Sequence, residues 1–208
     1  MALLHRAQLV PGKAEILQTL LASRSLISDG ETIEIAGAYR FDDPDGRVGI
    51  ETFLIAAADR VLQVPVTYRG EPLDGYEDSL VTTMEHSVLG RRWVYDATGD
   101  PVYAGTLTQT ILSGGTQAEL KYDYPAPPEK LNITTHVRGS GDSGTEVPTI
   151  DSVTTSRSET ATTIQANGVT LEIFHVIDPT RVAGADHSLS GTWPGQSTPV
   201  VLSTARLA

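Results

Sequence analysis

Short segments with a two-residue apolar period, separated by turn-forming residues, run from residue 31 to residue 95. Successive side chains of a β-strand point to opposite faces of a sheet, so this period predicts strands and not helices. The expected strands cover residues 32–41, 47–57, 61–69, 80–88 and 91–95. Their connections are short and rich in Asp, Pro and Gly, which favours a meander of sequential strands.

The third of these strands contains Pro65. Proline has no backbone N–H to donate, which predicts that residues 61–69 lie at an edge of the sheet or contain a bulge. An exposed strand end there would allow pairing with a second copy of the chain.

Two helices are expected to flank the meander. The first covers residues 11–23, where apolar side chains recur at helical spacing at Ala14, Leu17, Leu20 and Leu21. The second begins with Asp100 as its N-cap and Pro101 in its first turn, where a missing N–H costs nothing. It should end near Leu112, because two glycines follow shortly after.

The rest of the chain has a looser pattern. Residues 139–144 consist of Gly, Ser and Asp and are typical of a flexible linker. Further strands are expected at residues 132–138, 152–157, 160–165, 169–177 and 199–207. We therefore predict an α+β fold in three parts: residues 1–115, an extended segment with the linker at 116–150, and a small β-rich unit at 151–208.

Charge and composition exclude several classes of protein. The 208 residues carry a formal net charge of −11, which argues against nucleic acid or an anionic membrane as the main partner. The absence of cysteine excludes disulfides, thiolate metal sites and cysteine nucleophiles. No apolar run approaches the length of a transmembrane helix, and the first residues lack the apolar core of a secretory signal. We therefore expect a cytoplasmic protein, whose oligomeric state the sequence leaves open.

Signatures of cofactor, metal and phosphate chemistry are missing from the sequence. It contains no P-loop, no glycine-rich dinucleotide fingerprint and no kinase catalytic-loop motif. No two of the five histidines are separated by two or four positions, which argues against a transition-metal site. We therefore expect no cofactor, no bound metal and no catalytic residue.

The densest group of functional side chains lies between residues 84 and 96. It contains a carboxylate, an imidazole, two guanidinium groups and two aromatic rings: Glu85, His86, Arg91, Arg92, Trp93 and Tyr95. Arginine combined with Trp and Tyr is typical of sugar platforms and of protein-binding hot spots. We take these residues as the candidate binding surface. The alternative is that the aromatic rings pack in the core while the arginines extend to solvent.

Three stretches of the chain resemble the N-terminal cap of bacterial maltokinases: residues 37–51, 64–73 and 85–103. The third stretch, which reads EHSVLGRRWVYDATGDPVY, is the most specific in its order of residues. The resemblance extends over residues 4–115. It implies a curved antiparallel sheet with flanking helices, similar to the arrangement in cystatins.

Maltokinases transfer the γ-phosphate of ATP to maltose, and their cap precedes a kinase N-lobe and a helical C-lobe. Residues 151–208 resemble a small, reduced N-lobe. Within them, residues 156–163 match the Ser/Thr-rich nucleotide loop, and residues 171–179 match the strand that carries a lysine in the kinases. This chain has Glu172 at the lysine position, where a carboxylate would repel phosphate. No C-lobe is recognisable, so the resemblance implies a cap without kinase activity.

Three functions are compatible with these observations. The first, which we favour, is a non-catalytic binding or assembly module that docks to a protein or an α-glucan, near trehalose, maltose and α-glucan metabolism. The second is a small-molecule-binding protein or acid–base enzyme with a pocket under the curved sheet, which would use Glu85, His86, Tyr95 and Asp96. The third is a degenerate kinase that still binds nucleotide.

Overall fold

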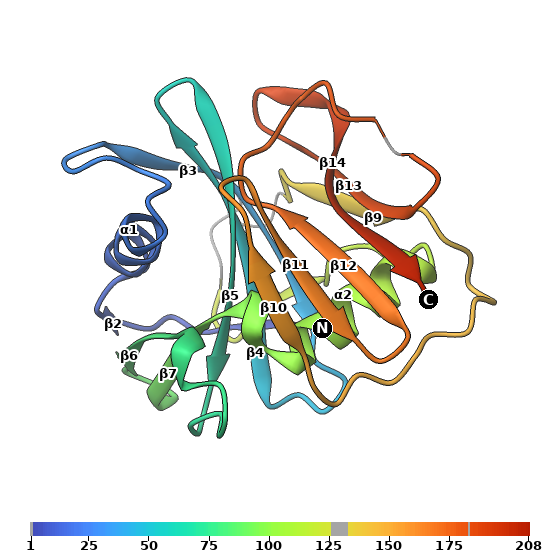
Figure 1. Cartoon of the computed structure of the whole chain (residues 1–208). Coiled ribbons are helices and arrows are strands. Elements are labelled where there is room, and N and C mark those ends of the chain that lie inside the picture. Colours follow the sequence, from blue (N-terminus) through green and yellow to red (C-terminus); the bar gives the residue numbers. More distant parts are fainter. Residues whose placement is uncertain (1, 126–132, 183) are drawn as a thin grey trace.

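The computed structural model describes residues 2–125, 133–182 and 184–208 (Figure 1). The helices in these ranges are α1 (Lys13–Ser23) and α2 (Pro101–Leu112), with single 3-10 turns η1 (Glu77–Ser79) and η2 (Ala97–Gly99). The strands are β1 (Ala2–Leu4), β2 (Leu9–Val10), β3 (Ile33–Asp42), β4 (Val48–Ala57), β5 (Arg60–Arg69), β6 (Leu80–His86), β7 (Gly90–Asp96), β8 (Leu120–Tyr122), β9 (His136–Gly139), β10 (Thr154–Arg157), β11 (Ala161–Ala166), β12 (Val169–Phe174), β13 (His187–Trp193) and β14 (Gln196–Leu207).

A six-stranded antiparallel sheet in the order β2-β6-β7-β5-β4-β3 forms the first part of the fold. The expected bounds of β3, β4 and β5 differ from the observed ones by at most one residue at each end. The predicted meander is confirmed for these three strands. Beyond them the order departs from the prediction, because β7, and not β6, pairs with β5.

The strand that contains Pro65 is not an edge strand, which corrects the expectation from the sequence. β5 pairs with β4 along its whole length and with β7 over residues 66–69. Earlier in β5, Gln63 donates its backbone N–H to the carbonyl of His175, 2.8 Å away. Backbone N–H groups two residues apart point to the same edge of a strand, so Pro65 lies where β5 changes partner and no donor is needed. Pro65 is also buried, and this strand offers no end for pairing with a second copy.

Helix α1 covers one face of this sheet. Its buried residues are Ile16, Leu17, Leu20 and Leu21. They belong to one apolar cluster with Phe53 of β4, Val64 of β5 and Val94 of β7. In Figure 1 the helix lies at the left of the sheet, on the side away from the rest of the molecule. The predicted helix is confirmed from Lys13 onward.

Helix α2 begins as the sequence predicts. Asp100 is its N-cap, and the carboxylate accepts a hydrogen bond of 2.9 Å from the backbone N–H of Val102. The same buried carboxylate accepts two hydrogen bonds from Arg69 of β5, at 2.7 and 2.6 Å. Charge-assisted pairs of this bidentate kind are strong and fix an orientation. Asp100 therefore starts the helix and also attaches it to the sheet.

A second six-stranded antiparallel sheet has the order β10-β11-β12-β14-β13-β9. Strands β10, β11, β12 and β14 lie close to their expected positions, within three residues at each end. β9 begins at His136, four residues after the expected start at residue 132, which lies outside the described residues. The sequence did not predict β13, which contains no regular apolar alternation.

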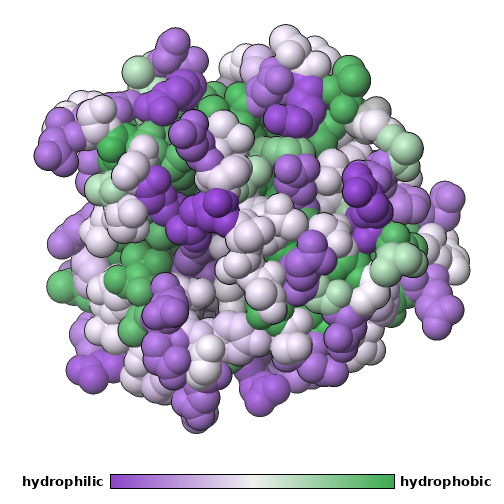
Figure 2. Space-filling view, in the orientation of Figure 1, coloured by the Kyte–Doolittle hydropathy of each residue, from purple (hydrophilic) through white to green (hydrophobic). Residues whose placement is uncertain are grey.

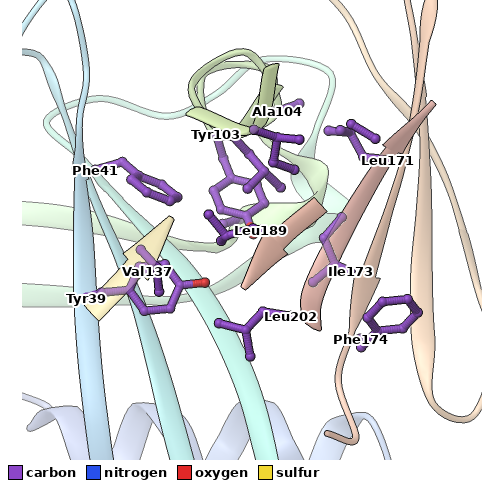
Figure 3. Close-up of a cluster of buried hydrophobic side chains, with 14 of the residues drawn as sticks. Tyr39, Phe41, Tyr103, Ala104, Val137, Leu171, Ile173, Phe174, Leu189 and Leu202 are labelled. Carbon is purple, nitrogen blue, oxygen red and sulfur yellow. The ribbon is translucent and has the colours of Figure 1, made fainter. Parts of the chain in front are cut away.

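The main core lies between the two sheets (Figure 3). Tyr39 and Phe41 of β3 face Leu189 of β13 and Leu202 of β14, and Tyr103 of α2 closes the cluster. These side chains come from both sides of the predicted segment at residues 116–150. The division of the chain into three parts stays a prediction.

The glycine-rich segment at residues 139–144 packs closely against α2 in its first half. Gly139 lies in β9 and donates its backbone N–H to the carbonyl of Gly115, 2.8 Å away. A Cβ at Gly139 would lie 2.0 Å from the carbonyl oxygen of Thr110, and Gly141 passes the same helix end equally closely. These glycines allow a close backbone approach, which corrects their interpretation as a flexible linker.

The described residues are mostly β with two α-helices and a curled antiparallel sheet, in agreement with the predicted α+β class. Figure 2 shows polar residues over most of one face of the molecule, with apolar patches between them. None of the helices in the described ranges is long and apolar enough to cross a membrane.

Candidate functional site

A pocket of about 470 Å³ opens on the α1 face of the first sheet. Helix α1 begins at Lys13. The part of the same sheet face that lies beyond this end of the helix is not covered by it, and the pocket opens there. The pocket is lined by Leu4, His5, Ala7, Leu9, Lys13, Arg40, Phe41, Asp42, Asp43, Gly46, Arg47, Val48, Gly49, Ile50, Tyr68, Met84, His86, Leu89 and Arg92. Pockets of roughly 300–1,000 Å³ are typical of small-molecule sites.

Paired charges lie beside this pocket, between it and a smaller adjoining one. Glu51 of β4 is only 5% exposed and accepts hydrogen bonds from Lys13 at 2.9 Å and from the hydroxyl of Tyr68 at 3.1 Å. A guanidinium nitrogen of Arg40 lies 2.9 Å from the same carboxylate. Burial raises the pKa of Glu51, but the positive charges of Arg40 and Lys13 outweigh it, and the net pKa is lowered. Glu51 is therefore ionised and neutralises one of the two cations beside it.

His86 of β6 presents a hydrogen-bond donor to the pocket. Its Nδ1 accepts hydrogen bonds from the backbone N–H groups of Val88 and Leu89, at 3.2 and 3.1 Å. The ring proton is therefore on Nε2. Burial lowers the pKa of His86, and the nearby positive charges of His5 and Arg92 lower it further. His86 is thus neutral at pH 7 and can donate one hydrogen bond to a bound molecule.

The six predicted binding residues are divided between the two faces of the sheet. His86 and Arg92 line the pocket. The other four lie on the opposite face of the sheet: Glu85, Arg91, Trp93 and Tyr95. Glu85 and Arg91 form an exposed ion pair of 3.0 Å. Tyr95 is buried, and its hydroxyl accepts a hydrogen bond from the backbone N–H of Leu73 at 2.8 Å. A binding role for the four residues on the opposite face stays a prediction.

The acid–base set of Glu85, His86, Tyr95 and Asp96 is not brought together. Glu85 and His86 are adjacent strand residues on opposite faces, and Tyr95 is covered by the loop before β6. Asp96 is buried outside the pocket lining, in a separate ion-pair cluster. The acid–base mechanism expected from these four residues is therefore wrong. Among the described residues, no group of three or more His, Asp or Glu side chains is arranged to hold a metal ion.

Residues 14–100 match the family model of the maltokinase N-terminal cap domain. The chain is similar to this family over these residues, which we call the cap domain below. The match runs from α1 through β7 and ends at Asp100, the N-cap of α2, so it contains every strand of the first sheet except β2. It confirms the resemblance over these residues, which are less than half of the chain, while the resemblance at residues 4–13 and 101–115 stays a prediction. No curated protein matches the chain.

The cap domain supplies most of the pocket, and the chain before it supplies the remainder. Five lining residues precede the matched segment: Leu4, His5, Ala7, Leu9 and Lys13. The pocket therefore lies where the cap sheet meets the N-terminal residues.

Sequence reasoning did not single out Lys13, Arg40, Glu51 or Tyr68. A local signal for them exists in β4, where Glu51 lies on the same face as the buried Phe53. A charged residue at an apolar-face position is buried only when it is paired. The break in the apolar alternation at Glu51 therefore indicates a paired charge on the α1 face of the sheet.

A second cluster of charges is buried where the cap domain meets the second sheet. Asp96 forms ion pairs with Arg24 at the end of α1 and with Arg157 of β10, the latter at 2.7 Å. The imidazole of His175 lies 3.3 Å from a guanidinium nitrogen of Arg24 and 2.6 Å from the hydroxyl of Thr162. Nδ1 of His175 also lies 3.3 Å from the backbone carbonyl oxygen of Gln63. The guanidinium of Arg24 beside the ring, together with burial, disfavours a protonated imidazole.

We expect this imidazole to make the stability of the fold depend on pH. Burial, and then the positive charge of Arg24, lowers the pKa of His175 to about 3 from a model-compound value of 6.5. Below pH 6.5 the unfolded chain binds a proton that the folded chain does not, so stability is lost as the pH falls toward 3. At 1.36 kcal/mol per pKa unit, the contribution of His175 should drop by about 2 kcal/mol between pH 7 and pH 5.

Urea denaturation at pH 7 and pH 5 measures this contribution. The variant His175→Gln should lose less stability between the two pH values than the wild type, by about 2 kcal/mol. The variant His136→Gln changes an exposed imidazole and should keep the dependence of the wild type. An identical pH dependence in the wild type and His175→Gln would show that this ring is not held neutral.

Proposed function

We propose that the chain is a non-catalytic binding module built on a maltokinase cap domain, and that the pocket beside Lys13 holds a small ligand. The observation that supports this is the pocket itself, with a volume of about 470 Å³. Apolar side chains such as Phe41 and Met84 line it together with several charged ones. Small-molecule sites typically combine apolar walls with a few polar groups that fix orientation. Glu85, His86, Tyr95 and Asp96 are not brought together, which argues against acid–base catalysis by these four residues.

A thermal-shift screen of small sugars, sugar phosphates and small carboxylic acids tests this function. A ligand that binds only the folded state stabilises it by about 2.7 kcal/mol at one hundred times its dissociation constant. For a chain of this size we expect the melting temperature to rise by roughly 5–10 °C. The variant Ala7→Phe, which places a large ring at the pocket, should abolish the shift.

The matched control is Ala185→Phe, because the same change there falls on an exposed loop outside the pocket. It should leave the ligand-induced shift unchanged. The proposed function is overturned if no compound class stabilises the protein, or if Ala7→Phe responds to the ligand as fully as Ala185→Phe does.

A second candidate function uses the opposite face of β7. Arg91 is largely exposed and Trp93 is partly exposed on that face, a combination suited to an α-glucan or a protein surface. We propose this face as the contact for such a partner in trehalose, maltose or α-glucan metabolism. Retarded migration of the wild type in an α-glucan gel, lost in Trp93→Ala, is the expected result. Identical migration with and without glucan would count against a glucan partner.

We further propose that the cap sheet has a cystatin-like curvature and that the second sheet corresponds to a reduced kinase N-lobe. At the position matched to the kinase lysine, Glu172 is exposed on β12. Its carboxylate would repel a triphosphate, so ATP with magnesium should not raise the melting temperature. A clear rise would favour a degenerate kinase that retains nucleotide binding. The cytoplasmic location stays a prediction.

A further inference from the structure

We infer that the pocket of the cap domain binds a small anionic ligand, whose phosphate or carboxylate group is held by Arg92, Lys13 and Nε2 of His86. This inference rests on the proposed function and adds the chemical class of the ligand.

The surroundings of the pocket are less acidic than the chain as a whole, which carries a formal net charge of −11. The lining cations are Lys13, Arg40, Arg47 and Arg92, and the lining carboxylates are Asp42 and Asp43. Counted with Glu51, and with Asp45, which forms an exposed ion pair of 2.9 Å with Arg47, these charges balance. In an acidic protein, a neutral region of this kind repels small anions least.

The carboxylate of Asp43 is used within the β3–β4 turn. One oxygen accepts from the backbone N–H of Asp45 at 3.0 Å. The other accepts from the N–H groups of Arg47 and Val48, each at 2.8 Å. These bonds hold the carboxylate in the turn, so it is not available to pair with the pocket cations.

Arg92 is the cation best placed for a ligand. No hydrogen bond or ion pair joins it to another residue within the described ranges, and it is only partly exposed. A Cβ at Gly70 would lie 2.8 Å from a guanidinium nitrogen of Arg92, so the glycine leaves room for this side chain. A partly buried guanidinium group loses some of its hydrogen bonds to water. An anion that accepts two parallel hydrogen bonds from this group replaces them.

The other two donors complete a site of positive potential. Lys13 shares Glu51 with Arg40, so the pair is only half neutralised. Lys13 and Arg40 also line a smaller adjoining pocket of about 160 Å³, and are reached from both sides. The lowered pKa of His86, caused by burial and then by surrounding cations, is a separate sign of the positive potential.

Isothermal titration calorimetry with glucose 1-phosphate, succinate and glucose tests the ligand class. We expect a phosphate or carboxylate probe to bind and glucose to bind at least tenfold more weakly. The two anionic probes distinguish a phosphate ligand from a carboxylate ligand. Arg92→Gln should weaken anion binding about tenfold or more, as expected for a lost charge-assisted hydrogen bond.

Arg138→Gln is the matched control, because it makes the same change at an exposed arginine of β9 that does not line the pocket. It should leave the affinity for the anion unchanged, and unchanged melting temperatures of both variants without ligand would show that they fold. Equal loss in the two variants, glucose binding as tight as that of the anions, or no anion binding at millimolar concentration overturns the anionic class.

These failures differ from a failure of the proposed function. A neutral ligand that binds the wild type and not Ala7→Phe would leave the pocket as the binding site and remove only its assignment to anions. An anion that binds Ala7→Phe as tightly as the wild type would place binding outside the pocket, and overturn both proposals.

Discussion

Replacing Gly139 by alanine is expected to lower the free energy of unfolding by about 4 kcal/mol or more. The added Cβ would lie 2.0 Å from the carbonyl oxygen of Thr110 and 2.7 Å from that of Ile111. Both oxygens are backbone atoms of α2, so the contact cannot be relieved by rotating a side chain. Either β9 or the end of the helix must move, with loss of the hydrogen bond from Gly139 to Gly115. Guanidinium denaturation followed by circular dichroism measures the effect.

Gly144→Ala is the control from the same glycine-rich segment. A Cβ at Gly144 would have no atom within 4 Å, and this position has no positive φ. The substitution should change stability by no more than about 0.5 kcal/mol. Equal stability of the two variants would restore the interpretation of residues 139–144 as a free linker. The segment begins and ends with glycine, so the residue type does not distinguish Gly139 from Gly144, and only the packing against α2 does.

The strands of the cap sheet are predictable because each has one face against α1 or against the core. In β5, for example, Leu62, Val64 and Val66 recur every second residue on the α1 face. The same reasoning fails for β13, which contains Ser188 and Gly191 at buried positions. A Cβ at Gly191 would lie 2.9 Å from side-chain atoms of neighbouring strands, so tertiary packing selects a residue that local propensity disfavours in strands.

The partner of a strand is also beyond local reasoning. Pro65 is disfavoured inside a sheet because it lacks a donor, and this rule predicted an edge. The structure satisfies the rule in another way, since β5 exchanges its pairing with the segment at His175 for pairing with β7 at this point. That exchange depends on residues more than one hundred positions later in the chain, which no local pattern around Pro65 contains.

Only part of the candidate site was predicted from the sequence, because the rest also depends on contacts between distant parts of the chain. His86 and Arg92 were included because they lie in a dense cluster of functional residues, yet the alternation of β6 and β7 separates them from Glu85 and Arg91. Lys13 begins a helix far from that cluster in the sequence, and only the packing of α1 on the sheet brings it to the pocket. Strand alternation identifies the face, whereas the residues that complete the site require the tertiary structure.

Asp96→Ala is expected to destabilise the fold by about 3–5 kcal/mol at pH 7. The Asp96 carboxylate pairs with Arg24, whose side chain is only 1% exposed, and with Arg157. It also accepts hydrogen bonds from the N–H and the hydroxyl of Thr98, at 3.0 and 2.7 Å. Its removal leaves Arg24 buried without a counter-ion. Burial, and then the charge of Arg157, already lowers the pKa of Arg24 to about 9, and the loss of Asp96 would lower this pKa further.

Asp186→Ala provides the control for a carboxylate that pairs with arginine at the surface. The side chains of Asp186 and Arg206 are 29% and 71% exposed, and loss of such a pair costs about 1 kcal/mol or less. The double variant Arg24→Met/Asp96→Ala should be less destabilised than the two single variants added together, because it removes the buried cation together with its partner. Strict additivity would show that Arg24 and Asp96 are not coupled. Arg24 and Asp96 both belong to the cap domain, whereas the ion pair of Asp96 with Arg157 of β10 connects this cluster to the second sheet.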